Sequence, residues 1–477
     1  MRPVVLARAP RYGCGGLNSG ETSLVSLNQR PGFAPVLWSS CLAMLAVGAN
    51  STAIMAALPR MRVELSLSPA GVQWAVNAYL VVSAASIVLG GRAGDWFGAR
   101  PGAMAGMAAF AAASCIIAIS DSQTALMAGR SLQGLAAALA VPCTLAAVDG
   151  SAAPERRAQA IGAWTGFLML GFSIGPLIGG ALTDAAGWRA IFWLNALLML
   201  TAMAGMASAG AAAAPSERRR GVSLDWIGFI LQAAFMTALI FGLQAAPHAR
   251  AAPLPLIGLM ALAAGSFVVL LIVEARVQAP LIDRNLFARR DFVMGLAIGS
   301  LAMFSIMSLL LYFNLYAQSP QGLALTALQA GASLVPLSAA LLALALTASA
   351  IAARVGLGAV MTGGMALIAI ACAIVGVAVS GGGSLMLAIG FLVMGAGLAL
   401  PYASAPRLAL SALSPDERGQ GSGLVNACTF LGGSFGVAGG AIAFGLGGLV
   451  AVLAMIAIAG LIGAALGCFA IERARQG

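Results

Sequence analysis

The chain has 477 residues, of which 61% are hydrophobic and only 8% are charged, with a formal net charge of +10. Soluble globular proteins carry about 25% charged residues, so this composition excludes a water-soluble enzyme and equally excludes a disordered chain. The apolar residues form long Ala, Leu and Gly runs rather than alternating strands, which favours membrane-spanning helices.

The first 33 residues are polar and contain Gly and Arg, and they lack the apolar core of a signal peptide. We predict a cytoplasmic tail there. A spanning helix needs about 20 apolar residues. Fourteen segments qualify, near 34–58, 72–91, 101–120, 124–148, 160–183, 189–210, 224–246, 253–273, 291–317, 327–352, 356–379, 384–411, 419–441 and 444–471.

The basic residues orient these spans. All 25 are Arg, and with a cytoplasmic N-terminus 20 of them fall on the cytoplasmic side, four on the opposite side and one, Arg130, within a span. The positive-inside rule then predicts that both termini are cytoplasmic. The net charge is therefore a topology signal with a secondary attraction to anionic lipid, and nucleic acid is not an expected partner.

A short polar motif separates the second and third predicted spans. Its residues Gly91, Asp95, Gly98 and Arg100 are expected to form a loop, because the two glycines permit a tight turn and close backbone approach. Asp95 can face a helix N-terminus or an Arg in one conformation and lose that contact in another. The motif is therefore a candidate gating loop, and the plainer interpretation is an ordinary charged loop.

The fourth span contains Arg130, followed by Gln133 and Gly134. From the rise of 1.5 Å per residue, Arg130 lies about 9 Å below the outer end of its helix. An Arg at that depth costs several kcal/mol unless it is paired or hydrated, so it marks a cavity or a proton path by default. The alternative is a structural Arg that bonds backbone carbonyls across the bundle.

The fifth span carries Gly171, Gly175, Pro176 and Gly179. The three glycines recur every four residues and form one bare stripe, against which a neighbouring helix can pack closely, and the proline can bend the span. A generic small-residue packing face is the plainer interpretation of the stripe.

An internal repeat supports two related halves. Residues 154–162 align without gaps with residues 415–423, sharing Pro, Arg, Gln and the final Gly, and both segments precede a span. The offset of eight spans equals a six-helix unit plus two helices. Parallel six-helix halves build one large class of transporters.

Together these motifs resemble the major facilitator superfamily, and within it the fourteen-helix drug:proton antiporter branch. The resemblance covers residues 40 to 470. It implies an all-α integral membrane fold with two six-helix bundles and two extra central helices. The implied divisions are a tail at 1–33, an N-terminal bundle at 34–210, a linker with the inserted pair at 211–290, a C-terminal bundle at 291–471 and a tail at 472–477.

The resemblance assigns roles to the motifs. The loop with Asp95 is implicated in locking the cytoplasmic side, and the Gly175-Pro176 string is a signature of antiport exporters. Asn50, at the end of the first span, stands where the branch has Asp, and an amide cannot titrate. No span interior holds a clear carboxylate, so the cargo is expected to be neutral, zwitterionic or anionic, with Arg130 as the attracting group.

We therefore predict a monomeric exporter in a bacterial inner membrane, with a small, mostly apolar substrate, protons as coupling ion, no cofactor and no metal. Its transport path is predicted at Arg130, Gln133 and Asn50. An uptake permease of the same fold or a non-transporting sensor or assembly protein are the alternatives, and a membrane enzyme lacks clustered catalytic residues. Candidate cavity residues are Asn77, Tyr79, Trp164, Asn314 and Asn426, and Trp74, Tyr312, Tyr316 and Tyr402 are further candidates. The plainer interpretation of any one of them is a packing residue or a residue of the interfacial aromatic belt.

Overall fold

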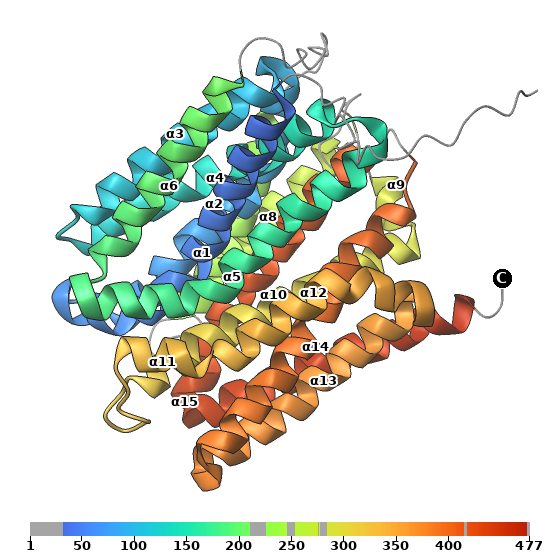
Figure 1. The fold of residues 1–477 in the computed structure, drawn as a ribbon. Coiled ribbons are helices and arrows are strands. Elements are labelled where there is room, and N and C mark those ends of the chain that lie inside the picture. The colour runs from blue at the N-terminus through green and yellow to red at the C-terminus, as the bar shows by residue number, and fades with distance from the viewer. Residues whose placement is uncertain are drawn as a thin grey trace, which may run out of the picture.

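The computed structural model describes residues 32–209, 226–245, 253–274, 276, 284–414 and 417–474. Within these ranges every regular element is helical (Figure 1). The predicted tail at 1–33 lies almost wholly outside the described residues, and so does most of the polar linker after the sixth span. The predicted all-α membrane fold is confirmed.

The first six long helices follow the predicted order. They are α1 (Phe33–Glu64), α2 (Pro69–Phe97), α3 (Ala99–Ala118), α4 (Gln123–Ser151), α5 (Arg157–Ala186) and α6 (Arg189–Ser208), with a 3-10 turn, η1, at Pro154–Arg156. The middle of the chain holds α7 (Trp226–Ala245), α8 (Pro253–Glu274) and the short α9 (Arg284–Phe287).

The remaining helices form the second half. They are α10 (Arg290–Ala317), α11 (Ala327–Ser333), α12 (Val335–Val355), α13 (Leu357–Val377), a π-helical turn η3 (Ala378–Gly382), α14 (Gly383–Ser411) and α15 (Arg418–Ala474). Twelve continuous helical stretches are long and apolar enough to span a membrane. Two of these stretches contain two helices each, α13 with α14 and the two arms of α15, so the described residues hold 12 + 2 = 14 spans, as predicted.

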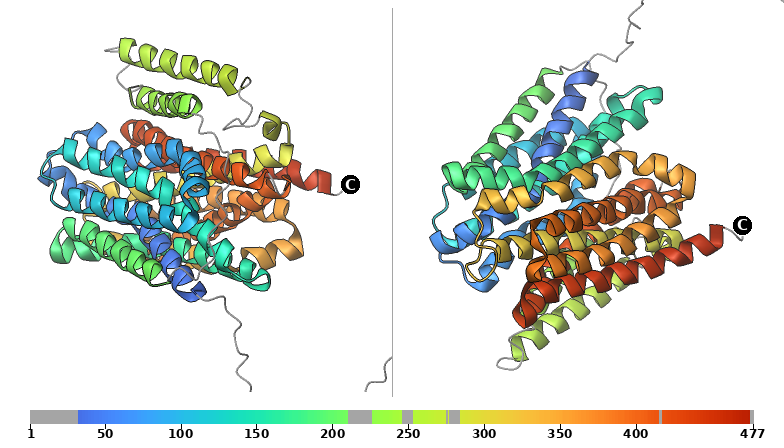
Figure 2. Two further views of the ribbon diagram at one scale, coloured as in Figure 1. Left: turned by 90° about the horizontal axis from the view of Figure 1, so that it is seen from above. Right: turned by 60° about the horizontal axis from the view of Figure 1, so that its bottom comes forward.

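Helices α1 to α6 pack mainly on one another, and so do α10 and α12 to α15, whereas α11 packs mainly on α5. The two groups meet where α5 contacts α11 and α12, where α2 contacts α15, and where α1 contacts α10. The pair α7–α8 lies along one flank, and α7 touches both α2 and α15 (Figure 2). The division at 34–210 and 291–471 stays a prediction.

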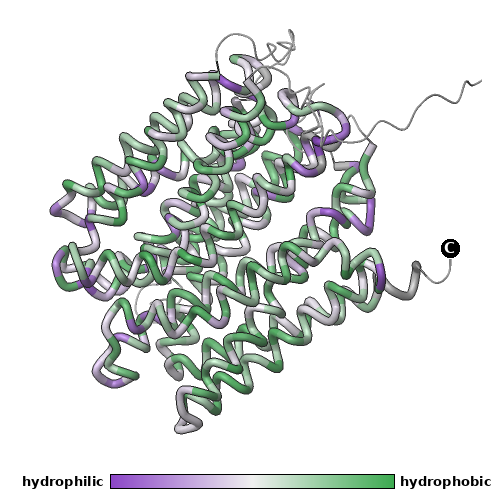
Figure 3. Tube along the Cα trace, viewed as in Figure 1, coloured by the Kyte–Doolittle hydropathy of each residue, from purple (hydrophilic) through white to green (hydrophobic). Residues whose placement is uncertain are grey.

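Hydrophilic residues gather at the two ends of the bundle and apolar residues cover the helices between them (Figure 3). We call one end the Gly98 end, where α2 meets α3, and the other the Arg189 end, where α5 meets α6. Because successive spans are antiparallel, α1, α10 and the first arm of α15 all run from the Gly98 end toward the Arg189 end.

The predicted gating loop is wrong in its secondary structure. Helix α2 continues to Phe97, and Gly98 alone, at φ 98°, separates it from α3. The reason lies in packing: a Cβ at Gly94 would lie 2.8 Å from the Sγ atom of Cys143 on α4, and one at Gly102 would lie 2.7 Å from it. Most glycines of this segment therefore serve a close helix contact, and only Gly98 serves a turn.

Two span boundaries also differ from the prediction. The span predicted at 327–352 is broken at Leu334 into α11 and α12, and Pro336 occupies the first turn of α12. The last two spans meet at Gly447 and Gly448, a few residues after the predicted junction, because these two glycines leave the helical conformation and bend α15 there.

Candidate functional site

The buried charge of the first half lies on α4. The hydroxyl of Ser122 caps this helix by accepting a hydrogen bond from the Ala125 backbone N–H (3.2 Å). Arg130 follows two turns into the helix and has no exposed surface. At the depth predicted from the sequence, the guanidinium of Arg130 is therefore fully enclosed by protein.

Arg130 is held by neighbours from three helices. Its Nε donates to the carbonyl oxygen of Ala75 on α2 (2.8 Å), and its Nη1 donates to Oε1 of Gln133 (2.7 Å). Gln133 in turn donates to the hydroxyl of Ser114 on α3 (2.8 Å). The Nη2 atom makes no hydrogen bond within the described residues. The site thus contains a fixed cation with unused donor capacity.

The guanidinium also stacks on an aromatic ring. Its central carbon lies 4.7 Å from the ring centroid of Tyr79 on α2, a cation–π contact. Tyr79 in turn packs edge-on against Phe430 of α15 (6.2 Å between centroids), which belongs to the other half. Arg130 is therefore separated by one ring from the contact between the halves.

Small residues bring α2 and α4 together at this site. A Cβ on Gly134 would lie 2.6 Å from the carbonyl oxygen of Tyr79, and the hydroxyl of Ser83 donates to the Gly134 carbonyl (3.1 Å). One turn of α4 thus contains the cation Arg130, its hydrogen-bond partner Gln133 and Gly134, which allows the close approach of α2.

Asn50 does not join this cluster. Its Oδ1 accepts a hydrogen bond from Nδ2 of Asn195 on α6 (2.9 Å), and both side chains are buried. The amide Nδ2 of Asn50 and both polar atoms of Asn77 have no hydrogen-bond partner within the described residues. The structure therefore brings Arg130 and Gln133 together and places Asn50 in a separate amide pair.

Three other predicted cavity residues make hydrogen bonds within their own helix or to a neighbouring helix. Trp164 donates to the hydroxyl of Thr144 (3.1 Å), and the amides of Asn314 and Asn426 donate to carbonyls one helical turn earlier. Tyr402 on α14 packs against Phe172 on α5, with ring centroids 6.3 Å apart. This second aromatic contact also joins the two halves.

The glycine stripe of α5 packs as predicted against a neighbouring backbone. A Cβ at Gly171 or Gly179 would lie within 2.4 Å of a carbonyl oxygen of α1, and one at Gly175 would overlap the Thr52 hydroxyl of α1. Thr52 itself donates across this contact to the carbonyl of Phe172 (3.2 Å).

The same helix also touches the other half. A Cβ at Gly180 would lie 2.2 Å from the carbonyl oxygen of Ala327, and one at Gly331 of α11 would lie 2.4 Å from that of Pro176. Asp184 of α5 accepts a hydrogen bond from the Leu328 backbone N–H (2.8 Å). Helix α5 is thus bound to α1 within its own half and to α11 across the contact.

At the Gly98 end, the predicted gating residues tie α3 to α6. Arg100 donates from Nη2 to the carbonyl oxygen of Met206, near the C-terminus of α6 (2.8 Å). The backbone of Asp95 lies in the last turns of α2, and its side chain is outside the described part of the chain.

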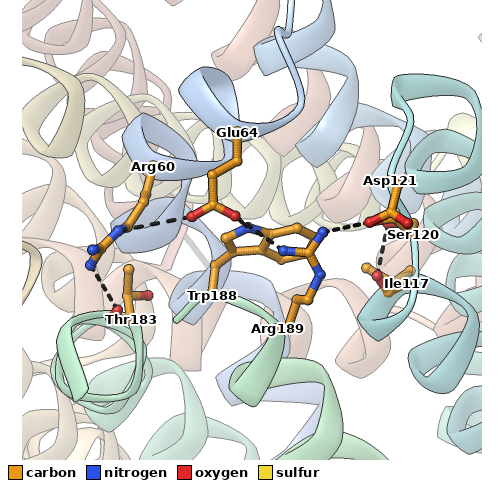
Figure 4. A network of polar contacts seen from close by, with 8 residues as sticks. All are labelled: Arg60, Glu64, Ile117, Ser120, Asp121, Thr183, Trp188 and Arg189. Atoms are coloured by element: carbon orange, nitrogen blue, oxygen red, sulfur yellow. Dashed lines mark hydrogen bonds and ion pairs between the residues drawn. The ribbon is translucent and has the colours of Figure 1, made fainter. Parts of the chain in front are cut away.

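The sequence interpretation missed a polar network at the Arg189 end (Figure 4). Arg189 pairs with Asp121 (2.9 Å) and with Glu64 (3.1 Å), and it lies over the ring of Trp188, which donates to Glu64 (2.8 Å). Arg60 extends the network to the Thr183 carbonyl (3.1 Å). All these residues lie at helix ends, which was the available signal, but their pairing depends on which helices are neighbours.

A second missed group is Glu274, the last residue of α8. It is 5% exposed, which makes it the one carboxylate among the described side chains that is buried. Because Glu274 lies at a helix end, the sequence interpretation groups it with the acidic residues outside the span interiors.

Comparisons with known proteins agree with this architecture. A family model described as the Major Facilitator Superfamily matches residues 40–437. The chain is 30% identical to the tetracenomycin C resistance and export protein of Streptomyces glaucescens, over 85% of this chain and 74% of that protein. It is 31% identical to the cephamycin export protein CmcT of Amycolatopsis lactamdurans, over 89% of this chain and 86% of that protein.

Solved structures share the fold at lower identity. The POT family transporter PepTSo superposes with a TM-score of 0.68 and 14% identity, covering 94% of this chain and 99% of that one. The human organic anion transporter MFSD10 gives a TM-score of 0.61 at 17% identity, covering 92% and 99%.

Proposed function

The chain belongs to the Major Facilitator Superfamily, and we propose that it is a secondary active exporter that moves a small, mostly apolar compound out of a bacterial cell in exchange for protons. The membership confirms the resemblance that the motifs predicted. The two similar bacterial proteins are export proteins for tetracenomycin C and cephamycin by name, which supports an antibiotic or related metabolite as cargo.

The observation that carries the proposal is the position of α5. Its glycines lie directly on the backbone of α1, and Gly180 lies directly on α11 of the other half. Helix α5 is packed tightly on α1 of its own half and meets α11 through a contact that is lost when the halves part, which fits transport by alternating rotation of two bundles around a central site. We infer that the contact between α5 and α11 closes the Arg189 end in this conformation.

The orientation of the protein in the membrane follows from the distribution of its Arg residues. Of the 25 Arg, 20 fall in segments that the alternation of spans assigns to the same side as the Gly98 end. We assign the Gly98 end to the cytoplasm by the positive-inside rule, with both termini there and the Arg189 end outside. The contact between α5 and α11 then lies on the outer side of the membrane.

Arg130 supplies the charge of the proposed cargo site. Because Nη2 has unused donors and Tyr79 and Phe430 line the path to the other half, the site favours an apolar compound that carries an acceptor oxygen. An organic cation would meet a fixed positive charge there. In the same scheme, Asp95 controls the inner end through contacts that change between conformations.

Asn50 cannot exchange a proton, and its amide pairs with Asn195. Proton exchange must therefore use a titratable group other than Asn50. Alternatively, the amide at position 50 restricts the set of compounds that the protein exchanges for protons.

Efflux from cells and proton flux into proteoliposomes test these roles, using the Arg130→Ala, Asp95→Asn and Asn50→Asp variants. We expect Arg130→Ala to abolish efflux, Asp95→Asn to reduce it, and Asn50→Asp to add proton-coupled efflux of cationic dyes. Unchanged efflux in the first two variants would remove the roles assigned to those residues. Uptake, rather than efflux, of the cargo would overturn the direction.

A further inference from the structure

Two adjoining hollows lie at the Arg189 end on the outer flank of the second half. One, of about 570 Å³, is lined by polar groups that include Arg62, Tyr316, Ser319 and Gln321. The other, of about 690 Å³, is lined by small and apolar residues of α13 and of the second arm of α15. Ser380 and Val450 line both, so the hollows form one groove with a polar and an apolar part.

The polar part carries one positive charge. Arg62, at the end of α1, is exposed, and no ion pair joins it to another described residue, although Arg60 and Glu64 on either side of it are both paired. Hydroxyl and amide groups of α10 and the loop after it face the same hollow. An anionic group with ester and hydroxyl oxygens matches this lining, because it accepts hydrogen bonds and neutralises the Arg.

The apolar part extends through most of one membrane leaflet. It runs from Ala369 to Val377 along α13, which is 8 residues or about 12 Å, and continues into η3. On the other side it runs from Val450 to Ala457 along the second arm of α15, which is 7 residues or about 11 Å. Half of a hydrocarbon core of about 30 Å is about 15 Å. Val377 and Val450 on the rim are 56% and 54% exposed, so the groove opens sideways toward lipid.

From this we propose that the groove binds an anionic phospholipid of the outer leaflet, with its phosphate at Arg62 and one acyl chain between α13 and the second arm of α15. Lipid tails are as apolar as the groove, so the acyl chain alone gives little preference for one lipid over another. The head group therefore decides which lipid binds. The outer-leaflet assignment uses the orientation proposed above, whereas the site itself does not depend on export activity.

The test uses the full chain in nanodiscs that contain equal amounts of phosphatidylglycerol and phosphatidylcholine, with the retained lipid counted by native mass spectrometry. We expect the wild type to retain phosphatidylglycerol preferentially, and Arg62→Gln to lower that preference at this site about five-fold, which corresponds to about 1 kcal/mol for one basic side chain at a charged membrane surface. Arg354→Gln, at the other end of the bundle, is the charge-matched control.

The groove itself is tested by filling it. A Cβ at Gly376 would meet only the Cδ1 of Leu453, at 4.0 Å, so Gly376→Leu fits the fold and occupies the groove. Gly363→Leu, on the same helix and facing open space, is the matched control. Ala373→Leu provides a second filling variant should Gly376→Leu fold poorly.

If one lipid occupies both parts of the groove, the effects of the Arg62 variant and of the groove-filling variant must not add. We expect the double variant Arg62→Gln with Gly376→Leu to lose no more phosphatidylglycerol than the stronger single variant, whereas the losses of Arg354→Gln and Gly376→Leu add. Equal retention of the two lipids by the wild type, an unchanged preference in Arg62→Gln, equal losses in Gly363→Leu and Gly376→Leu, or additive losses at Arg62 and Gly376 would each overturn the proposal.

Discussion

The contact between Gly180 and α11 gives a direct test of how the Arg189 end closes. A methyl group on Gly180 would lie 2.2 Å from the carbonyl oxygen of Ala327, 2.7 Å from its carbonyl carbon and 3.0 Å from the Cα of Leu328. All three are backbone atoms, so no side-chain rotation relieves the overlap. An ordinary carbon–oxygen contact requires about 3.3 Å, so the halves must separate by about 1 Å.

The expected magnitude follows from this overlap. Overpacking of this kind costs about 1–3 kcal/mol. Since Gly180 and Ala327 belong to different halves, the cost falls on the closed conformation and is relieved when the halves part. Gly180→Ala should therefore shift the equilibrium toward the conformation with an open Arg189 end by about 5- to 150-fold.

Spin labels on the two halves measure this shift. Cysteines replace the exposed Thr124 and Gln321 in a chain without its seven native cysteines, and pulsed electron resonance gives the distribution of label distances. Gly180→Ala should enlarge the long-distance population. Gly162→Ala, on the same helix with nothing within 4 Å of the added Cβ, should leave it unchanged.

A third variant separates closure from general packing damage. Gly179→Ala places its Cβ 2.3 Å from the carbonyl oxygen of Ala53, which belongs to the same half. It should lower thermal stability by about 1–3 kcal/mol without changing the label distances. If Gly180→Ala behaves like Gly162→Ala, or if Gly179→Ala shifts the distances as much as Gly180→Ala, the α5–α11 contact does not set the closed state.

Three further outcomes are expected. Arg130→Lys keeps the charge but loses the two directed hydrogen bonds, each worth about 1.5–3 kcal/mol at a charged group. Efflux should therefore fall at least about ten-fold although the protein still folds. Efflux at the wild-type rate would contradict the role assigned to Arg130. Hydrogen bonds from Ser414 and then the Arg289 guanidinium lower the pKa of Glu417, so its stabilising effect is present above the unfolded pKa and is lost as pH falls through the lower folded pKa. Melting curves from about pH 6 to about pH 3 should therefore show a steeper acid loss in the wild type than in Glu417→Gln. Arg189→Gln breaks two solvent-exposed ion pairs and should lower stability by about 1 kcal/mol in dilute buffer and by less in about 1 M salt. An effect independent of salt would refute an electrostatic origin.

The sequence predicted what depends on local composition. Apolar runs of about 20 residues give the fourteen spans, because backbone groups in lipid must bond within their own helix. The depth of Arg130 follows from the helical rise. Its hydrogen bond to Gln133 comes from the structure, and it agrees with helical spacing, since residues three apart share a face. Glycines at intervals of four in α5 likewise indicated a close neighbour, although not which one.

What the sequence did not predict depends on contacts between distant segments. Asn50 and Asn195 are 145 residues apart, and hydropathy carries no information on which spans become neighbours. The sequence predicts a tight turn and close backbone approach at Gly91 and Gly98, whereas in the structure only Gly98 forms a turn and the close contact with Cys143 on α4 is made at Gly94. The same residue type serves a turn or a close contact, and only the partner helix distinguishes the two roles.

The position of Arg130 also limits the cargo. Removing a guanidinium from water is costly, and two hydrogen bonds and one aromatic ring compensate it while Nη2 remains unused. A compound with an acceptor oxygen adds a charge-assisted hydrogen bond worth about 1.5–3 kcal/mol, or roughly 10- to 150-fold in binding, whereas a cation adds repulsion. In the proposed cargo site this positive charge selects against cations, and Glu274, the sole buried carboxylate among the described side chains, lies elsewhere in the chain, at the end of α8. We therefore propose that Arg130, although costly to bury, supplies the selectivity that an apolar cavity lacks.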